Sequence, residues 1–292
     1  NMAVSLGAKV YLADVDPQTG QMTPATLINC IKKNKIKKIK IILTMYMGGY
    51  PENAVEFYKI KKKFNCLIIE DACHAFGSRY FFKNKYYYIG SCKHADISTF
   101  SLHPLKPITT GEGGIVTTNN PKFFGKTVLY RSHGIIRNKS YHWKYNVITH
   151  GYNYRLSDIN CALGISQLNK IHIFLKKRKK IYNFYIKHLD GYKNKVNFPK
   201  YNLKNMPSYH LMIMNINLKN KKDEFFKFLL KNKIIVQFHY IPLYKFSIFK
   251  DKLKYKNSEK YYSSTVSVPI FHELDKNKQL KIIKKIKNFI NK

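Results

Sequence analysis

Three side chains of complementary chemistry occur where two short apolar segments end. Residues 66–70 form a strand-like run that ends at Asp71. Residues 96–101 form a second run that ends at Ser101, and Lys106 follows in the next loop. An amine, a carboxylate and a hydroxyl are the groups that an enzyme needs to hold pyridoxal phosphate. The lysine forms an imine with the aldehyde, the acid pairs with the pyridine nitrogen, and the hydroxyl helps to hold the phosphate.

The elements that must position these groups alternate in type along the first half of the chain. Thr23 and Pro24 have the residue types of an N-cap and a first helical residue, so a helix is expected from there to about Lys33. A second helix is expected over residues 53–64. Strands are expected over residues 10–13, 39–44, 66–70, 96–101 and 114–118. Strands separated by helices predict an α/β fold, with a mostly parallel sheet and helices on both of its faces. Ligands bind such sheets beyond the carboxyl ends of the strands, where Asp71 and Ser101 fall.

The second half of the chain predicts a smaller unit. A long helical stretch with one break is expected after Ser157, over about residues 156–189. Strands are expected over residues 209–217, 234–241 and 266–269, with a helix over residues 221–231. The tail from Asp275 carries an isoleucine stripe that is compatible with a membrane surface. We favour a helix that closes a small α/β domain. The expected division is a large domain over residues 1–178 and a small C-terminal domain over residues 179–292.

The charge of the chain is strongly basic, with 53 lysines and arginines against 16 acidic residues and a net charge of +37. Nucleic-acid binding is one interpretation of such a charge. It is disfavoured because the excess is lysine spread along the whole chain, whereas forked phosphate and base contacts favour arginine. A cationic surface would also attract an anionic nucleotide substrate.

Other features of the composition narrow the class of protein. Five cysteines without a C-x-x-C pair predict reduced thiols in the cytoplasm, and neither a disulfide framework nor a metal site. No apolar run approaches the length of a membrane-spanning helix, so no membrane association is expected.

Several segments together resemble a known family, the pyridoxal phosphate-dependent sugar-nucleotide aminotransferases of the DegT/DnrJ/EryC1/StrS group. This resemblance covers the whole chain and implies the aspartate aminotransferase fold. The segments that carry it are residues 70–78, 100–114, 131–134, 151–158, 162–168 and 236–242.

The resemblance implies a role for each candidate residue. Lys106 matches the lysine that binds the cofactor covalently and shuttles a proton, and Asp71 matches the partner of the pyridine nitrogen. Ser101 matches a phosphate ligand, and His74 matches a residue beside the cofactor ring. Asn153 resembles an asparagine that reaches the phosphate of the neighbouring subunit, which implies a homodimer.

Three further residues lie where the family binds the sugar or the nucleotide: His103, His239 and Tyr240. A structural role is nearly as well supported for these three. The resemblance is greatest to the branch of the pseudaminic acid pathway. That branch converts a UDP-linked 4-keto-6-deoxy-N-acetylhexosamine to its 4-amino sugar with glutamate as donor. A related branch that carries histidine in place of the lysine performs dehydration, so Lys106 favours transamination.

Three classes of function stay open from the sequence: an active aminotransferase for this or another nucleotide-linked keto sugar, a catalytically silent fragment, and a basic nucleic-acid-binding protein. Family members carry a longer N-terminal segment that includes part of the phosphate site. The resemblance therefore implies a truncated chain with an open pocket wall and weak cofactor binding.

Overall fold

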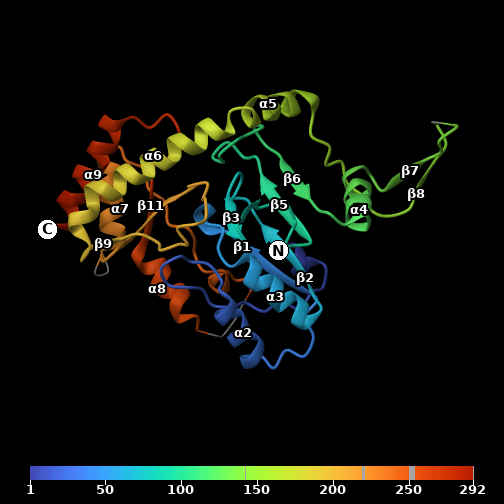
Figure 1. Cartoon of the computed structure of the whole chain (residues 1–292), viewed down its shortest axis with the longest axis horizontal. Coiled ribbons are helices and arrows are strands. Elements are labelled where there is room, and N and C mark those ends of the chain that lie inside the picture. Colours follow the sequence, from blue (N-terminus) through green and yellow to red (C-terminus); the bar gives the residue numbers. More distant parts are fainter. Residues whose placement is uncertain (142, 219–220, 250–253, 292) are drawn as a thin grey trace.

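The computed structural model describes residues 1–141, 143–218, 221–249 and 254–291. Its central sheet has the strand order β1-β2-β5-β6 (Figure 1). The first three strands are parallel, and β6 pairs with β5 in the antiparallel direction. The bounds are β1 Ile41–Met45, β2 Leu67–Asp71, β5 Ile97–Ser101 and β6 Gly114–Thr117. The expected strands over residues 39–44, 66–70, 96–101 and 114–118 are thus confirmed within a few residues, as is the mostly parallel sheet.

Two helices cover one face of this sheet, α2 (Pro24–Lys33) and α3 (Ala54–Phe64). Thr23 caps α2 as expected, because its side chain accepts the amide of Thr26. Apolar side chains of both helices form a buried cluster with those of β1 and β2; they include Leu27, Ile31, Phe57, Ile42 and Ile68. On the other face of β1, Ile41 and Leu43 are exposed. Within the described residues, helices therefore do not cover both faces at this edge of the sheet.

A second unit contains the antiparallel sheet β11-β10-β9, which helices enclose. Its strands are β9 Val196–Asn197, β10 Met212–Ile216 and β11 Thr265–Val268. Its helices are α7 Lys222–Lys231, α8 Lys256–Ser264 and α9 Lys276–Ile290, with short turns η2 Asp190–Tyr192 and η3 Leu243–Lys245. The isoleucine stripe of the tail faces this core, because Ile283 and Ile286 are buried in it and Ile290 packs against it. The tail is therefore the helix that closes the unit, as favoured from the sequence.

Two consecutive helices join the units, α5 (Asp158–Leu168) and α6 (Ile171–Leu189). The expected break in the long helical stretch is confirmed at Asn169 and Lys170, and Ser157 caps α5. The expected domain boundary at residues 178 and 179 falls inside α6. Phe174 of this helix packs with Leu102 and Ile108, whereas Tyr182 belongs to the core of the second unit. The division into two domains stays a prediction.

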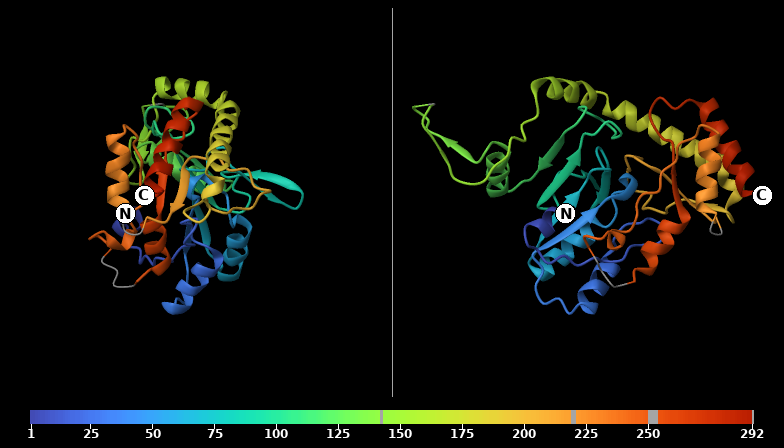
Figure 2. Two further views of the ribbon diagram at one scale, coloured as in Figure 1. Left: turned by 90° about the vertical axis from the view of Figure 1, so that its left-hand side faces the viewer. Right: turned by 180° about the vertical axis from the view of Figure 1, so that it is seen from behind.

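An arm projects from the body of the molecule at the end opposite to α9, as Figure 1 and the right-hand view of Figure 2 show. It consists of α4 (Pro121–Arg131) and the hairpin of β7 (Ile135–Arg137) and β8 (Tyr145–Val147). Aromatic and branched side chains are exposed along it: Phe124, Tyr141, Trp143, Tyr145, Val147, Ile148, Tyr152 and Tyr154.

Two expected strands are wrong. Residues 10–13 form no ladder, and Val10 and Tyr11 remain exposed beside the short helix α1 (Met2–Ser5). In residues 234–241 only Gln237 pairs with β11, through two backbone hydrogen bonds with Ser267. The chain then leaves the sheet and carries His239 and Tyr240 toward the end of β2.

A hairpin absent from the sequence prediction follows β2, formed by β3 (Arg79–Phe82) and β4 (Lys85–Tyr88). Its two-residue turn places Lys83 and Asn84 at positive φ. No glycine marks this turn, so the usual hairpin signal is missing. Among the described residues, no helix is both long and apolar enough to cross a lipid bilayer.

Candidate active site

Asp71 lies at the carboxyl edge of the central sheet, at the end of β2. The amide of Ala72 donates to the carbonyl of Thr99 in β5, so the two strands end together. The amide of Cys73 donates to Asp71 Oδ1 at 3.0 Å. This hydrogen bond forms an Asx-turn, and it fixes the direction of the Asp71 carboxylate.

Lys106 lies in the loop after β5, and backbone contacts hold that loop against the sheet. The amide of Leu102 donates to the carbonyl of Gly113, and the amide of Thr110 donates to the carbonyl of Leu102. Partial burial lowers the pKa of the Lys106 amine from its ordinary value, although Cys73 and Asp71 act in the opposite direction. A lower pKa increases the share of free amine at neutral pH, the form that attacks a carbonyl.

His74 is the most deeply buried of the candidate residues, at 2% exposure. Its Nδ1 accepts the amide of Gly48 at 3.3 Å, and its Nε2 lies 3.1 Å from the hydroxyl of Tyr240. The ring of His210 packs on it with centroids 4.3 Å apart. Burial first, and then the charges of Lys106 and His239, lower the pKa of His74 to about 3. The ring is therefore neutral at physiological pH.

Residues of the second unit fasten the loop that carries His74. The Ser208 hydroxyl donates to the carbonyl of His74 at 2.6 Å, and the Ser208 amide donates to Ser78 Oγ at 2.9 Å. The approach requires glycine at position 49 of the turn η1 (Met47–Gly49). Gly49 has φ +88°, and a Cβ there would lie 2.0 Å from Ser208 Oγ. The two units therefore meet at His74.

Replacement of Ser208 with alanine should destabilise the protein by about 1–3 kcal/mol, because the buried His74 carbonyl would lose its donor. Chemical unfolding would measure the loss. Ser263→Ala is the matched control, since that exposed hydroxyl bonds only to its own helix, at Lys260. Equal stability of the two variants would contradict a fastening role for Ser208.

His239 and Tyr240 arrive at the same place from the segment after α7. His239 Nδ1 lies 2.9 Å from Ser267 Oγ, and burial together with Lys106 lowers the pKa of its ring to about 4. Burial, followed by the charge of Asp71, raises the pKa of Tyr240. Thus Asp71, His74, Lys106, His239 and Tyr240, which the sequence analysis selected from three distant segments, come together.

The other three candidates lie at the margin or outside this cluster. Ser101 ends β5, and its hydroxyl accepts the amide of His103 at 3.3 Å. The His103 ring is half-exposed and lies 3.8 Å from Glu112. Asn153 is exposed in the segment that returns from the arm, where it forms an antiparallel bridge with Ser132. The roles expected for Ser101, His103 and Asn153 therefore stay predictions.

Sequence reasoning missed three residues of the cluster: Cys73, Ser208 and His210. Burial and the neighbouring Asp71 raise the pKa of the Cys73 thiol to about 12, so it is not a thiolate. His210 is buried, its pKa is lowered, and its Nδ1 has no hydrogen-bond partner among the described residues. Ser208 and His210 are polar residues that directly precede the buried strand β10, and this position was the only local indication that they could belong to a site.

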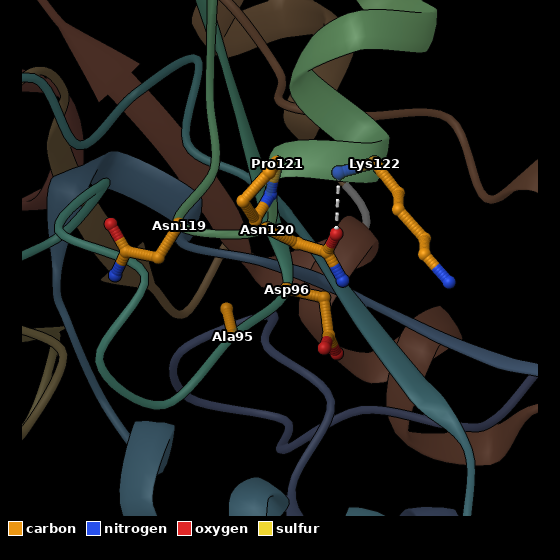
Figure 3. A pocket seen from close by; sticks show the side chains of 6 residues that line it. All are labelled: Ala95, Asp96, Asn119, Asn120, Pro121 and Lys122. Carbon is orange, nitrogen blue, oxygen red and sulfur yellow. Dashed lines mark hydrogen bonds between the residues drawn. The ribbon is translucent and has the colours of Figure 1, made fainter.

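A cavity of about 570 Å³ lies elsewhere, at the opposite end of β5 (Figure 3). Two of its polar side chains, Asp96 and Asn120, have partners nearby. Asp96 accepts from Lys61 and from the amide of Ile68, and Asn120 accepts the amide of Lys122. It contains none of the clustered residues, so we place the chemistry at the carboxyl edge instead.

The donor set at the carboxyl edge fits pyridoxal phosphate. An amine of lowered pKa suits an aldehyde, a carboxylate suits a pyridinium nitrogen, and a neutral buried imidazole suits the face or edge of an aromatic ring. The unpartnered Nδ1 of His210 leaves one buried polar atom available beside His74. Lys106, Asp71 and His74 are the residues that would hold the cofactor.

Comparison with known proteins agrees with this class of site. The model of the DegT/DnrJ/EryC1/StrS aminotransferase family matches residues 1–287. The chain therefore belongs to this family of aminotransferases.

Individual relatives cover most of the chain. It is 37% identical over 280 residues to the UDP-4-amino-4,6-dideoxy-N-acetyl-beta-L-altrosamine transaminase of Campylobacter jejuni, covering 94% of this chain and 72% of the relative. Over 185 residues, 63% of this chain and 47% of the relative, it is 34% identical to the GDP-perosamine synthase of Escherichia coli O157:H7.

Among solved structures, Helicobacter pylori PseC, an aminotransferase involved in the biosynthesis of pseudoaminic acid, superposes with a TM-score of 0.87. It is 27% identical, and the match covers 100% of this chain and 76% of PseC. The aminotransferase TlmJ of Streptoalloteichus hindustanus superposes with a TM-score of 0.88 at 19% identity, covering 99% of this chain and 75% of TlmJ. The fold is that of the pyridoxal phosphate-dependent aminotransferases, as expected from the sequence.

Proposed function

We propose that this protein uses pyridoxal phosphate to transfer the amino group of glutamate to the C4 ketone of a UDP-linked 4-keto-6-deoxy-N-acetylhexosamine. The observation that carries the proposal is the meeting of Lys106 and Asp71 with His74 and Tyr240 at the carboxyl edge of the sheet. The identity to the Campylobacter transaminase supports the choice of substrate.

The residues of the site divide the work of the reaction. Bound pyridoxal phosphate would supply an aldehyde and a ring that accepts electrons. Asp71 would hold its carboxylate at the ring nitrogen, and Ser101 would offer its hydroxyl to the phosphate. Lys106 Nζ would take a proton from the α-carbon of the amino donor and, in the second half-reaction, give a proton to C4 of the sugar. The neutral His74 would pack beside the ring without adding a charge.

Product analysis tests the substrate. The protein, loaded with cofactor and supplied with glutamate, is offered UDP-, dTDP- and GDP-linked 4-keto sugars, and the amino sugars are identified by mass spectrometry. Amination of the UDP-linked N-acetyl sugar in preference to the others is the expected result. Exclusive use of a GDP-linked sugar would favour the second candidate, for which the identity to GDP-perosamine synthase is the supporting observation.

A homodimer with shared sites is part of the proposal. The arm lies at the end of the molecule away from α9 (Figure 1), and it exposes aromatic side chains such as Phe124, Trp143 and Tyr145. Exposed apolar surface of this kind favours contact with another protein surface. Asn153, which lies in the segment returning from the arm, is the residue proposed to reach the cofactor phosphate in a second copy. Location in the cytoplasm stays a prediction that rests on a cysteine content without a C-x-x-C pair.

Mixing an inactive Lys106→Ala protein with an inactive Asn153→Ala protein should restore part of the activity. One of the two sites in each mixed dimer would then keep both residues. Activity is measured after subunit exchange, which mass spectrometry of isotope-labelled subunits verifies. Exchange without any recovery would show that Asn153 does not act across an interface.

A further inference from the structure

The hydrogen bonds of His74 determine which of its two ring nitrogens carries the proton. The amide of Gly48 donates to His74 Nδ1 at 3.3 Å. A backbone amide can only donate, so Nδ1 must present its lone pair. The ring is 2% exposed and is neutral. Its single proton is therefore on Nε2.

This assignment sets the direction of the next hydrogen bond. His74 Nε2 lies 3.1 Å from the Tyr240 hydroxyl. Since Nε2 carries the proton, it donates and Tyr240 Oη accepts. The hydroxyl hydrogen of Tyr240 must then point away from His74. In the part of the chain that the structure describes, Tyr240 Oη has no other hydrogen-bond partner, and the side chain is 47% exposed.

The Tyr240 hydroxyl lies at the reacting end of the site, close enough to Asp71 for that carboxylate to raise its pKa. Its hydroxyl contacts a histidine three residues after Asp71, and His239, the residue before it, lies close enough to Lys106 to respond to the charge of that amine. An oxygen with a free lone pair is the natural partner of the hydrogen that Tyr240 Oη still has to donate.

We propose that His74 is a positioning residue that orients the Tyr240 hydroxyl as a donor, and that Tyr240 donates to a sugar oxygen of the nucleotide-sugar substrate next to the reacting carbon. This inference rests on the proposed function for the identity of the substrate. It adds a fixed direction to the contact, from Gly48 through His74 and Tyr240 to the substrate. The opposite direction would put a proton on Nδ1 against the amide of Gly48.

Nitrogen-15 spectra of the histidine rings test the direction without substrate or added cofactor. The His74 resonances are identified by their loss in His74→Asn. We expect the neutral form protonated at Nε2 throughout the range from pH 6 to 8, and a shift of the Nε2 signal in Tyr240→Phe. Tyr244→Phe is the matched control, because that hydroxyl bonds to Glu259 instead. Protonation at Nδ1, or a doubly protonated ring at neutral pH, would overturn the proposal.

A double-mutant cycle on the loaded enzyme tests the consequence for the substrate. Asparagine at position 74 can still accept the Gly48 amide but is too short to reach Tyr240, whereas glutamine keeps a donor at the position of Nε2. Tyr240→Phe should raise KM for the nucleotide sugar about five- to tenfold, the size expected for one lost hydrogen bond. The KM for glutamate should change less than twofold.

The cycle separates the contact with Tyr240 from any effect of His74 on the cofactor. An effect through the cofactor is the same with Tyr or Phe at position 240, so it cancels. We expect His74→Asn to raise the sugar KM about fivefold more when Tyr240 is present than when Phe replaces it. His74→Gln should restore most of the affinity. An equal effect in both backgrounds would refute the positioning role.

Failure of the proposed function would look different. The unmodified protein would then aminate no nucleotide-linked keto sugar, while the ring spectra would still report the direction of the His74 contact. If this inference fails, the protein still aminates the sugar, and the effects of His74→Asn and Tyr240→Phe on the free energy of sugar binding are additive.

Discussion

Replacement of Lys106 with alanine should reduce turnover by about 10³-fold or more, because no other described amine lies beside Asp71 to move the proton. Borohydride treatment of the cofactor-loaded parent protein should leave a stable pyridoxyl label on Lys106, which peptide mapping would locate. The variant should take up no label.

Lys222 provides a matched control for this experiment. Burial also lowers the pKa of its amine, to about 8, but the amine lies over the rings of Tyr262 and Phe238 in the second unit. Reactivity governed by pKa alone would label Lys222 as well. A label found mainly on Lys222, or on any lysine other than Lys106, would reject the assignment.

Asp71→Asn should retain the cofactor but slow both half-reactions by about 10²-fold or more, as expected when an electrostatic contact to developing charge is lost. The amide keeps an oxygen for the Cys73 backbone, so the turn after β2 should survive. It cannot hold a negative charge at the ring nitrogen. The rate at which glutamate bleaches the absorption of the bound cofactor measures the effect.

Asp96→Asn is the control for Asp71→Asn. Asp96 immediately precedes the first residue of β5, at the edge of the sheet opposite to Asp71, and its carboxylate pairs with Lys61. Its loss should lower stability while the bleaching rate remains that of the parent. If Asp71→Asn also bleached at the parent rate, Asp71 would not be the partner of the ring nitrogen.

The elements that the sequence predicted well are those with a strong local signal. Thr23, Pro24 and Ser157 mark helix starts by their own chemistry, and separate apolar runs mark the strands of the central sheet. The wrong strand over residues 234–241 has the apolar residues of a strand, but only Gln237 finds a ladder partner. Strand pairing is decided by tertiary contacts that local pattern does not contain.

The site was predictable to the extent that it lies at strand ends. Asp71 and Lys106 follow apolar runs, so both position and chemistry indicated them. His210 and Ser208 belong to the site only because the second unit folds onto the loop after β2. Nothing in their local sequence specifies that contact. The direction of the His74 hydrogen bonds needed coordinates for the same reason, since it depends on Gly48 and Tyr240 at once.

The contacts that close the site join residues made at very different times. His74 and Tyr240 are 166 positions apart, and Ser208 lies 134 positions after His74. A ribosome adds roughly 5–20 residues per second, so Tyr240 follows His74 by roughly 10–30 s. The loop after β2 lacks Tyr240 during the whole of that interval, and it lacks Ser208 during most of it. Assembly of the pocket is therefore a late event of biosynthesis, and a nascent chain that stops before residue 240 cannot complete it.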